Sequence, residues 1–94
     1  MTESDKNKII KDSWVAHTIV EESYQQNRAV KGDSHWLDKQ RVLLADMALH
    51  LLQTALNSGE LQQDKLRNNL FSILTIAEQF LPDTNLSQVK NRIY

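Results

Sequence analysis

The chain has 94 residues, 24% of them charged, and a net charge of −1, values typical of a single soluble domain spanning residues 1–94. It contains two Gly and one Pro, far below the roughly 12% of average composition, which argues against a sandwich or barrel with many tight turns. The balance of 11 Lys+Arg against 12 Asp+Glu lacks the basic excess that nucleic acid or an anionic membrane attracts. The absence of Cys excludes disulfide scaffolds and thiolate metal sites.

The first eight residues, MTESDKNK, are polar and precede no apolar run typical of a signal peptide, so we expect a cytoplasmic location. The longest uncharged stretch, residues 47–59, is short of the ~18 apolar residues that a membrane-spanning helix needs. A domain of this size hides only about 60–65% of its unfolded surface. Self-association is therefore a natural supplement to its small core.

Apolar residues recur at intervals of three and four along the chain, which predicts helices throughout. We expect the first helix over residues 4–30, with Ser13 and His17 on its inner side. Gly32 is expected to end this helix, and Asp33 or Ser34 to cap the next one. The inner stripe of the first helix is predicted to contain Ile9, Ala16, Ile19, Val20 and Tyr24.

The second helix, expected over residues 35–57, is apolar around most of its circumference. Its polar residues form a narrow strip, which we expect to face water. A helix of this kind must be flanked on several sides, by helices of its own chain or of a second subunit. The predicted polar strip consists of His35, Lys39, Asp46, His50 and Gln53.

A third helix is expected over residues 61–81, where Pro82 stops it. A short last helix would follow, capped by one of residues 83–85 and carrying Leu86, Val89 and Ile93 on one side. Short turns between long helices favour antiparallel neighbours. The sequence thus predicts an all-α fold, an antiparallel up-and-down helical bundle of three long helices plus a short C-terminal helix, completed by dimerisation.

Two histidines form i, i+4 pairs with a carboxylate, His17 with Glu21 and His50 with Asp46. In an antiparallel hairpin these four residues come level with one another and could hold zinc, iron or manganese. Because Asp46 and His50 lie on the polar strip, we instead expect them to point to water. We therefore predict no metal, no cofactor and no catalytic site.

Two alternative functions remain open. Asp38-Lys39-Gln40-Arg41 resembles part of the Asp-x-x-Arg-Glu motif of the small dimeric all-helical chorismate mutases, but position 42 is Val and the early Arg of the first helix is missing. This resemblance implies an enzyme site that is shared between subunits and binds a dicarboxylate. The binding residues present form an incomplete site and are Arg28, Lys31, Arg41 and Gln79. Residues 57–74 could form a helix-turn-helix, which would make the chain a DNA-binding regulator, although nucleic acid is not the expected partner.

Trp14 and Phe71 fall on otherwise polar sides of their helices. Each is either covered by another helix of the same chain or presented to a partner, where aromatic residues contribute much of the binding energy. We assign both to binding surfaces, together with Leu49, Leu52 and Leu56 of the second helix. The leading prediction is a small helical protein that acts by binding a second copy of itself and another protein, as adaptor, inhibitor or regulator. Enzyme activity is not the expected function, although it stays open as an alternative.

Overall fold

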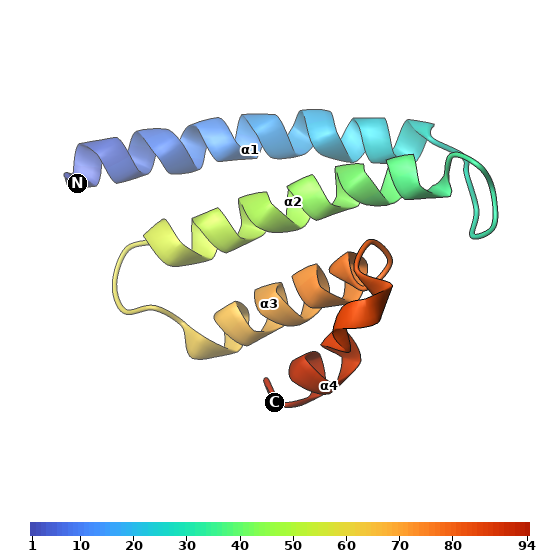
Figure 1. Ribbon diagram of the computed structural model, residues 1–94. Helices are drawn as coiled ribbons and strands as arrows, with labels where there is room; N and C mark the ends of the chain where they lie inside the picture. Colours follow the sequence, from blue (N-terminus) through green and yellow to red (C-terminus); the bar gives the residue numbers. More distant parts are fainter.

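The computed structural model describes residues 1–94 as an all-α fold, as predicted, with no strand. Three long helices lie antiparallel and each packs on the next in chain order, while the short last helix folds back onto the third (Figure 1). No helix is long and apolar enough to cross a membrane. The elements are α1 (Glu3–Gln26), α2 (Trp36–Leu56), α3 (Gln63–Ala77), the 3-10 turn η1 (Pro82–Thr84) and α4 (Leu86–Asn91).

The beginning of α1 is fixed by a capping box. The Thr2 hydroxyl accepts from the Asp5 backbone N–H at 3.0 Å, and the Asp5 carboxylate accepts from the Thr2 backbone N–H at 3.4 Å. The two bonds satisfy backbone donors that the first turn of a helix leaves free. Glu3 and Asp5 also place negative charge at the positive end of the helix dipole.

The end of α1 differs from the prediction, because the helix stops at Gln26 and not near residue 30. The Asn27 side chain accepts from the Ala29 backbone N–H, and the Asp33 carboxylate accepts from the Val30 backbone N–H. These side-chain bonds offer the backbone an alternative to further helix. Asp33 therefore closes the connecting turn and does not cap α2, whose N-cap His35 makes no side-chain cap bond.

The two later helices are also shorter than predicted. α3 ends at Ala77, and a turn with Pro82 in its 3-10 segment leads on to α4. Asn85 occupies the N-cap of α4, within the predicted range, but with φ +53° it lies in the left-handed region and its side chain makes no cap bond. Asn tolerates this conformation better than most residues because its short polar side chain can bond locally.

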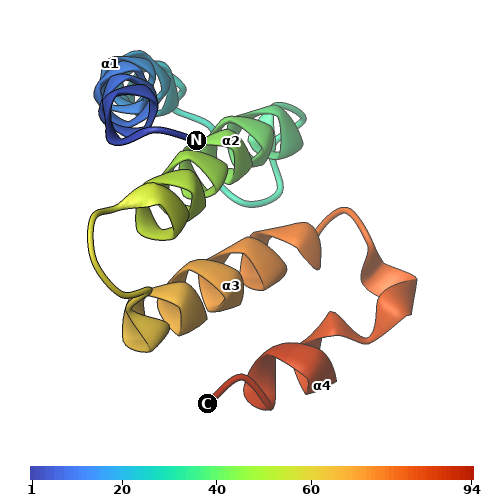
Figure 2. The same ribbon diagram turned by 90° about the vertical axis from the view of Figure 1, so that its left-hand side faces the viewer.

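The helices form a layer and do not wrap a central core. The molecule measures 44 × 33 × 17 Å, so its thinnest direction is less than two helix diameters of about 10–12 Å each. Figure 2 shows α1, α2 and α3 following one another across this layer. The radius of gyration is 15.0 Å, against about 12.4 Å for a compact domain of this length.

The residues buried in the layer are mostly polar. Ile76 is the one fully buried hydrophobic residue, whereas Ser13, Gln40, Asp46 and Gln53 are all buried. The accessible surface is 6818 Å² for a mass of 10.9 kDa, and a folded monomer of that mass usually exposes about 5,600 Å². The subunit thus leaves roughly 1,200 Å² more surface in water than its size requires.

The prediction that the polar strip of α2 faces water holds for His35, which is exposed, but is wrong for the strip's members that lie against α1. Asp46 and Gln53 are buried and His50 is half-buried, because the strip faces α1 and finds polar partners there. Hydrogen bonding offsets the cost of removing these groups from water. Much of the apolar arc of α2 is consequently turned away from α1.

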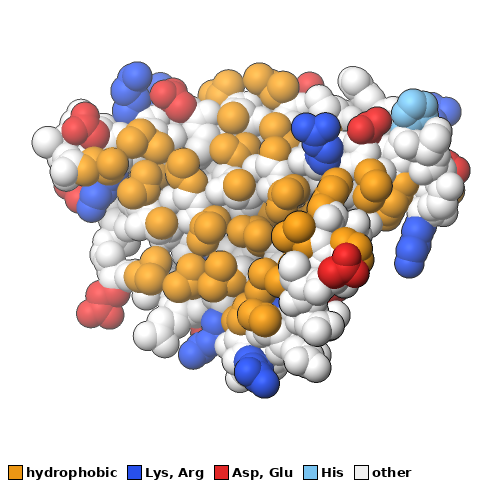
Figure 3. Space-filling model, in the orientation of Figure 1, with side chains coloured by type: hydrophobic (Ala, Val, Ile, Leu, Met, Phe, Trp, Pro, Cys, Tyr) orange, Lys and Arg blue, Asp and Glu red, His pale blue; other side chains and the backbone are white.

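One broad side of the layer carries the displaced apolar residues, and Figure 3 shows hydrophobic side chains spread over α1, α2 and α3 on it. A shallow groove opens between α1 and α2 on this side of the layer. By the 3.6-residue repeat, the apolar residues in question project from their helices toward the same side as this groove. None of them is fully buried. We call this surface the apolar face; it comprises Ile19, Val20, Val42, Ala45, Ala48, Leu49, Leu52, Leu56, Leu66, Leu70, Ile73 and Ala77.

Candidate functional site

A cluster of two histidines and two carboxylates lies where α1 meets α2. The Nδ1 atom of His17 is 2.5 Å from Asp46 Oδ1, and its Nε2 atom is 2.9 Å from Glu21 Oε2. On the other side of the aspartate, His50 Nε2 is 3.5 Å from Asp46 Oδ2. The Asp46 carboxylate therefore lies between two imidazole rings, with one ring on each oxygen.

The cluster is shielded from water to different degrees. Asp46 is 8% exposed, the side chain of His17 is 17% exposed, and that of His50 is 32% exposed. The two imidazole rings meet edge to face at 4.9 Å between centroids. Trp14 adds its edge to both rings, at 5.4 Å from His17 and 6.2 Å from His50, and covers them from the α1 side.

The same seam continues toward the end of α2 through a second polar pair. The Ser13 hydroxyl donates to the Ile10 backbone carbonyl at 2.6 Å and accepts from Gln53 Nε2 at 3.0 Å. Ser13 and Gln53 are both buried. The α1–α2 contact is thus held in register by hydrogen bonds between side chains and not by apolar packing alone.

The sequence identified the four members of the cluster but gave the wrong orientation for two of them. Asp46 and His50 do not point to water; they face α1, and His17 pairs with Asp46. The signal that carries this arrangement is the pair of i, i+4 repeats, His17 with Glu21 and Asp46 with His50, on facing helices. Nδ1 or Nε2 of His17 and His50 and a carboxylate oxygen of Asp46 lie within 4.8 Å of one another, so these three residues could hold a metal.

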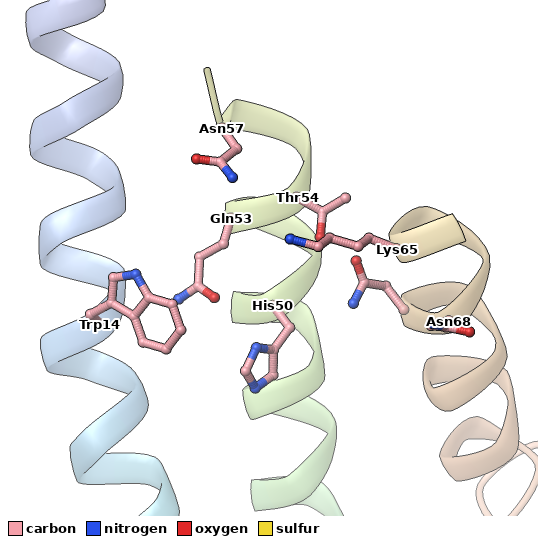
Figure 4. A pocket seen from close by; sticks show the side chains of 8 residues that line it. Trp14, His50, Gln53, Thr54, Asn57, Lys65 and Asn68 are labelled. Atoms are coloured by element: carbon pink, nitrogen blue, oxygen red, sulfur yellow. The ribbon is translucent and has the colours of Figure 1, made fainter. Parts of the chain in front are cut away.

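Next to the cluster, a polar pocket of about 340 Å³ opens between α1, α2 and α3 (Figure 4). Asn69 Oδ1 is buried there without a hydrogen-bond partner. Lys65 supplies the one charged side chain of the wall, and the sequence gave no signal for this pocket. Its lining is Trp14, His50, Gln53, Thr54, Asn57, Lys65, Asn68 and Asn69.

The pocket and the apolar face lie on opposite sides of the layer. Thr54 lines the polar pocket and Ala45 lines the groove between α1 and α2; nine residues apart, they are roughly 180° apart around the helix. The groove has a volume of about 450 Å³ and is bordered by one acidic and one basic residue, Asp38 and Arg41. Ile19, 61% exposed, lies at its α1 edge.

The five residues predicted to form binding surfaces fall in three places. Leu49, Leu52 and Leu56 lie on the apolar face and are partly exposed. Trp14 is 50% exposed and lies on the other side, at the rim of the polar pocket. Phe71 packs against the ring of Tyr94 at 5.4 Å, so the end of its own chain covers part of a side chain that the sequence assigned to a binding surface.

The contact between α3 and α4 is built on a charged cluster. Glu78 accepts from the Ser87 hydroxyl at 2.8 Å and from Lys90 Nζ at 3.2 Å. The Ser87 hydrogen bond, aided by Lys90 and opposed by desolvation, lowers the pKa of Glu78 below its usual range. Lys90 also lies 5.4 Å from the centre of the Phe71 ring, and Tyr94 donates to Asn68.

The residues singled out for the enzyme alternative do not gather. Arg28 lies in the α1–α2 connection, Arg41 borders the groove, and Gln79 is held between the Trp36 indole and the Gln40 amide. For the DNA-binding alternative, α2 and α3 lie side by side and antiparallel (Figure 1). A helix-turn-helix instead crosses its two helices at about 90–120°.

Comparison with protein-family models, with curated proteins and with solved structures found no match for this chain.

Proposed function

We propose that this protein acts through protein–protein interaction, as a homodimer whose subunits meet through the apolar face. The observation that carries the proposal is that Ile76 is the one buried residue among its hydrophobic residues, while one side of the layer is covered by partly exposed aliphatic side chains (Figure 3). Contiguous apolar surface of this kind on a small domain marks an interaction site. A second layer on this side would give the helices the two-layer core that folded domains normally have.

The excess surface of the chain is as large as the area that each subunit of a stable dimer buries. The chain exposes 6818 Å², roughly 1,200 Å² above the norm for its mass. If each subunit buries that excess, the interface totals about 2,400 Å², within the range of obligate homodimers. A contact of this size is larger than the ~1,600 Å² of an ordinary transient complex.

A second copy of the chain fits the charges around the face. Asp38 and Arg41 border the same groove, and a two-fold axis places the Asp38 side of one copy toward the Arg41 side of its mate. The net charge of −1 per chain adds little repulsion between subunits. These features favour a self-complementary contact over a partner of strongly acidic or basic surface.

Dimerisation through the apolar face leaves the opposite side free for another protein. That side carries the half-exposed Trp14 and the polar pocket with Lys65, and a Trp surrounded by hydrogen-bonding groups suits the centre of a binding site. On this proposal the dimer is an adaptor, inhibitor or regulator that presents two such surfaces. We also propose that this dimer acts in the cytoplasm.

The oligomeric state tests the proposal directly. Light scattering on a sizing column should give twice the 10.9 kDa chain mass for the unmodified protein. Ala48→Glu places a charge in the middle of the apolar face at a position exposed in the subunit, so it should give helical monomers. The matched control is Asn7→Glu, an exposed position on α1 away from the face, which adds the same charge and should leave the dimer intact. A monomer mass for the unmodified chain up to high micromolar concentration would refute the proposal.

A further inference from the structure

We propose that His17, Asp46 and His50 form a zinc-binding site between α1 and α2, in place of the absence of a metal that the sequence predicted on the assumption that Asp46 and His50 point to water. The three residues offer two imidazole nitrogens and a carboxylate oxygen within 4.8 Å of one another. This ligand set, two His and one carboxylate, is one that zinc and similar divalent metals use. The inference is independent of the apolar face, which lies on the other side of the layer.

The three ligands lie within reach of one tetrahedral ion once the Asp46 carboxylate turns. Ligand atoms that lie 2.0–2.1 Å from zinc are about 3.3–3.4 Å apart at tetrahedral angles. The three candidate ligand atoms all lie within 4.8 Å of one another. His17 Nδ1 is 2.5 Å from Asp46 Oδ1 and His50 Nε2 is 3.5 Å from Asp46 Oδ2, so the carboxylate must turn to offer one oxygen to an ion that both imidazoles share.

Because the Asp46 carboxylate is buried, a bound cation would stabilise it. At 8% exposure the carboxylate is largely removed from water, and the groups within ion-pair distance of it are His17 and His50, with no Lys or Arg among them. A buried carboxylate is costly unless it is paired with a positive charge or coordinates a metal. A zinc ion supplies both a positive charge and a bond to the carboxylate oxygen.

The surroundings provide the support that metal-binding histidines usually have. A ligating His commonly donates its second ring N–H to a carboxylate, which fixes the tautomer and the ring orientation. With His17 Nδ1 on the metal, its Nε2 atom donates to Glu21 at 2.9 Å. Trp14 packs its edge against both imidazole rings and limits their rotation.

Three protein ligands leave one coordination position of a tetrahedral ion for water or another ligand. His50 and Trp14 belong to the wall of the polar pocket as well as to the cluster. The free position is therefore next to a cavity with room for a small polar molecule, about 340 Å³.

The test is a zinc titration of the chelator-treated, tag-free chain by calorimetry, in competition with a chromophoric indicator. We expect saturation at one zinc per chain and a rise in Tm. Asp46→Asn and His17→Ala should each weaken binding by more than about 100-fold, since they remove a ligand, while Glu21→Gln should weaken it by about 10- to 100-fold, as loss of a supporting carboxylate does. His35→Gln is the matched control, because His35 is exposed and pairs only with Asp38, and it should bind like the unmodified chain.

Circular dichroism of each metal-free variant reports whether it still folds. Should Asp46→Asn unfold, His50→Gln decides the question, since its side chain is only half-buried. Cobalt provides a second readout, because His₂Asp coordination gives the intense visible absorption of tetrahedral Co²⁺, and this absorption should disappear in His50→Gln. The proposal is overturned by the absence of saturable binding at one zinc per chain, by binding that survives in the folded His50→Gln and His17→Ala variants, or by binding that is lost in His35→Gln.

Discussion

Truncation of Leu52 is the sharpest measure of what the apolar face contributes. Leu52 lies near the middle of the face and is partly exposed in the subunit. In a monomer, loss of this side chain costs only the contacts that its own chain makes with it, and that cost does not depend on concentration. In a dimer the same change removes apolar area that the second subunit covers.

The magnitude follows from the atoms removed. Leu→Ala deletes three carbon atoms, worth about 2.4 kcal/mol when fully desolvated at about 0.8 kcal/mol each. Because Leu52 is mostly covered within its own chain, at most about a third of this, about 0.8 kcal/mol, depends on the second subunit. Two-fold symmetry doubles it to about 1.6 kcal/mol per dimer, or a roughly 15-fold rise in the dimer Kd.

Sedimentation equilibrium over a wide concentration range measures this Kd, and thermal melts over the same range separate association from subunit folding by mass action. Leu61→Ala serves as the control, since Leu61 is 49% exposed in the α2–α3 connection and lies outside the apolar face. It should leave the dimer Kd within about twofold. A Leu52→Ala variant that loses stability equally at every concentration, with an unchanged dimer Kd, would refute the reasoning.

Further predictions concern the seams and the aromatic residues. Trp14→Ala should keep the helix content measured by circular dichroism but reduce the binding free energy for a protein partner by on the order of 2 kcal/mol. Phe71→Ala should release the C-terminal helix, because Phe71 packs against Tyr94, and limited proteolysis should then cleave this helix. Because the pKa of Glu78 is lowered in the folded chain, its carboxylate stabilises the fold at pH values above its ordinary pKa of 4.5. This stabilisation is lost as the pH falls through the lower pKa of the folded state. Protease protection of the C-terminal helix should show this acid transition, and Glu78→Gln should abolish it. Ser13→Ala leaves the buried Gln53 amide without its partner and should cost about 1–3 kcal/mol in denaturant unfolding, while the double variant with Gln53→Leu should recover part of the loss.

The helices could be predicted from the sequence because their determinants are local. The three- and four-residue spacing of apolar side chains, together with few Gly and Pro, indicated three long helices and a short one, and all four are present. Helix ends were less predictable, since Asn27 and Asp33 use their side chains to form a turn where the pattern allowed more helix. Such bonds depend on the path of the following residues and not on periodicity.

The direction in which each side of α2 faces was decided by tertiary structure alone. Periodicity shows that one side is polar and the rest apolar, and the usual rule sends the polar side to water. Here the polar side meets Ser13 and His17 of α1, which satisfy Gln53 and Asp46, so the polar side is buried and the apolar face stays uncovered. A sequence pattern indicates only whether a side chain prefers water or protein on average. The hydrogen bond between His17 and Asp46 joins residues 29 positions apart, so it forms only when the two helices pack together.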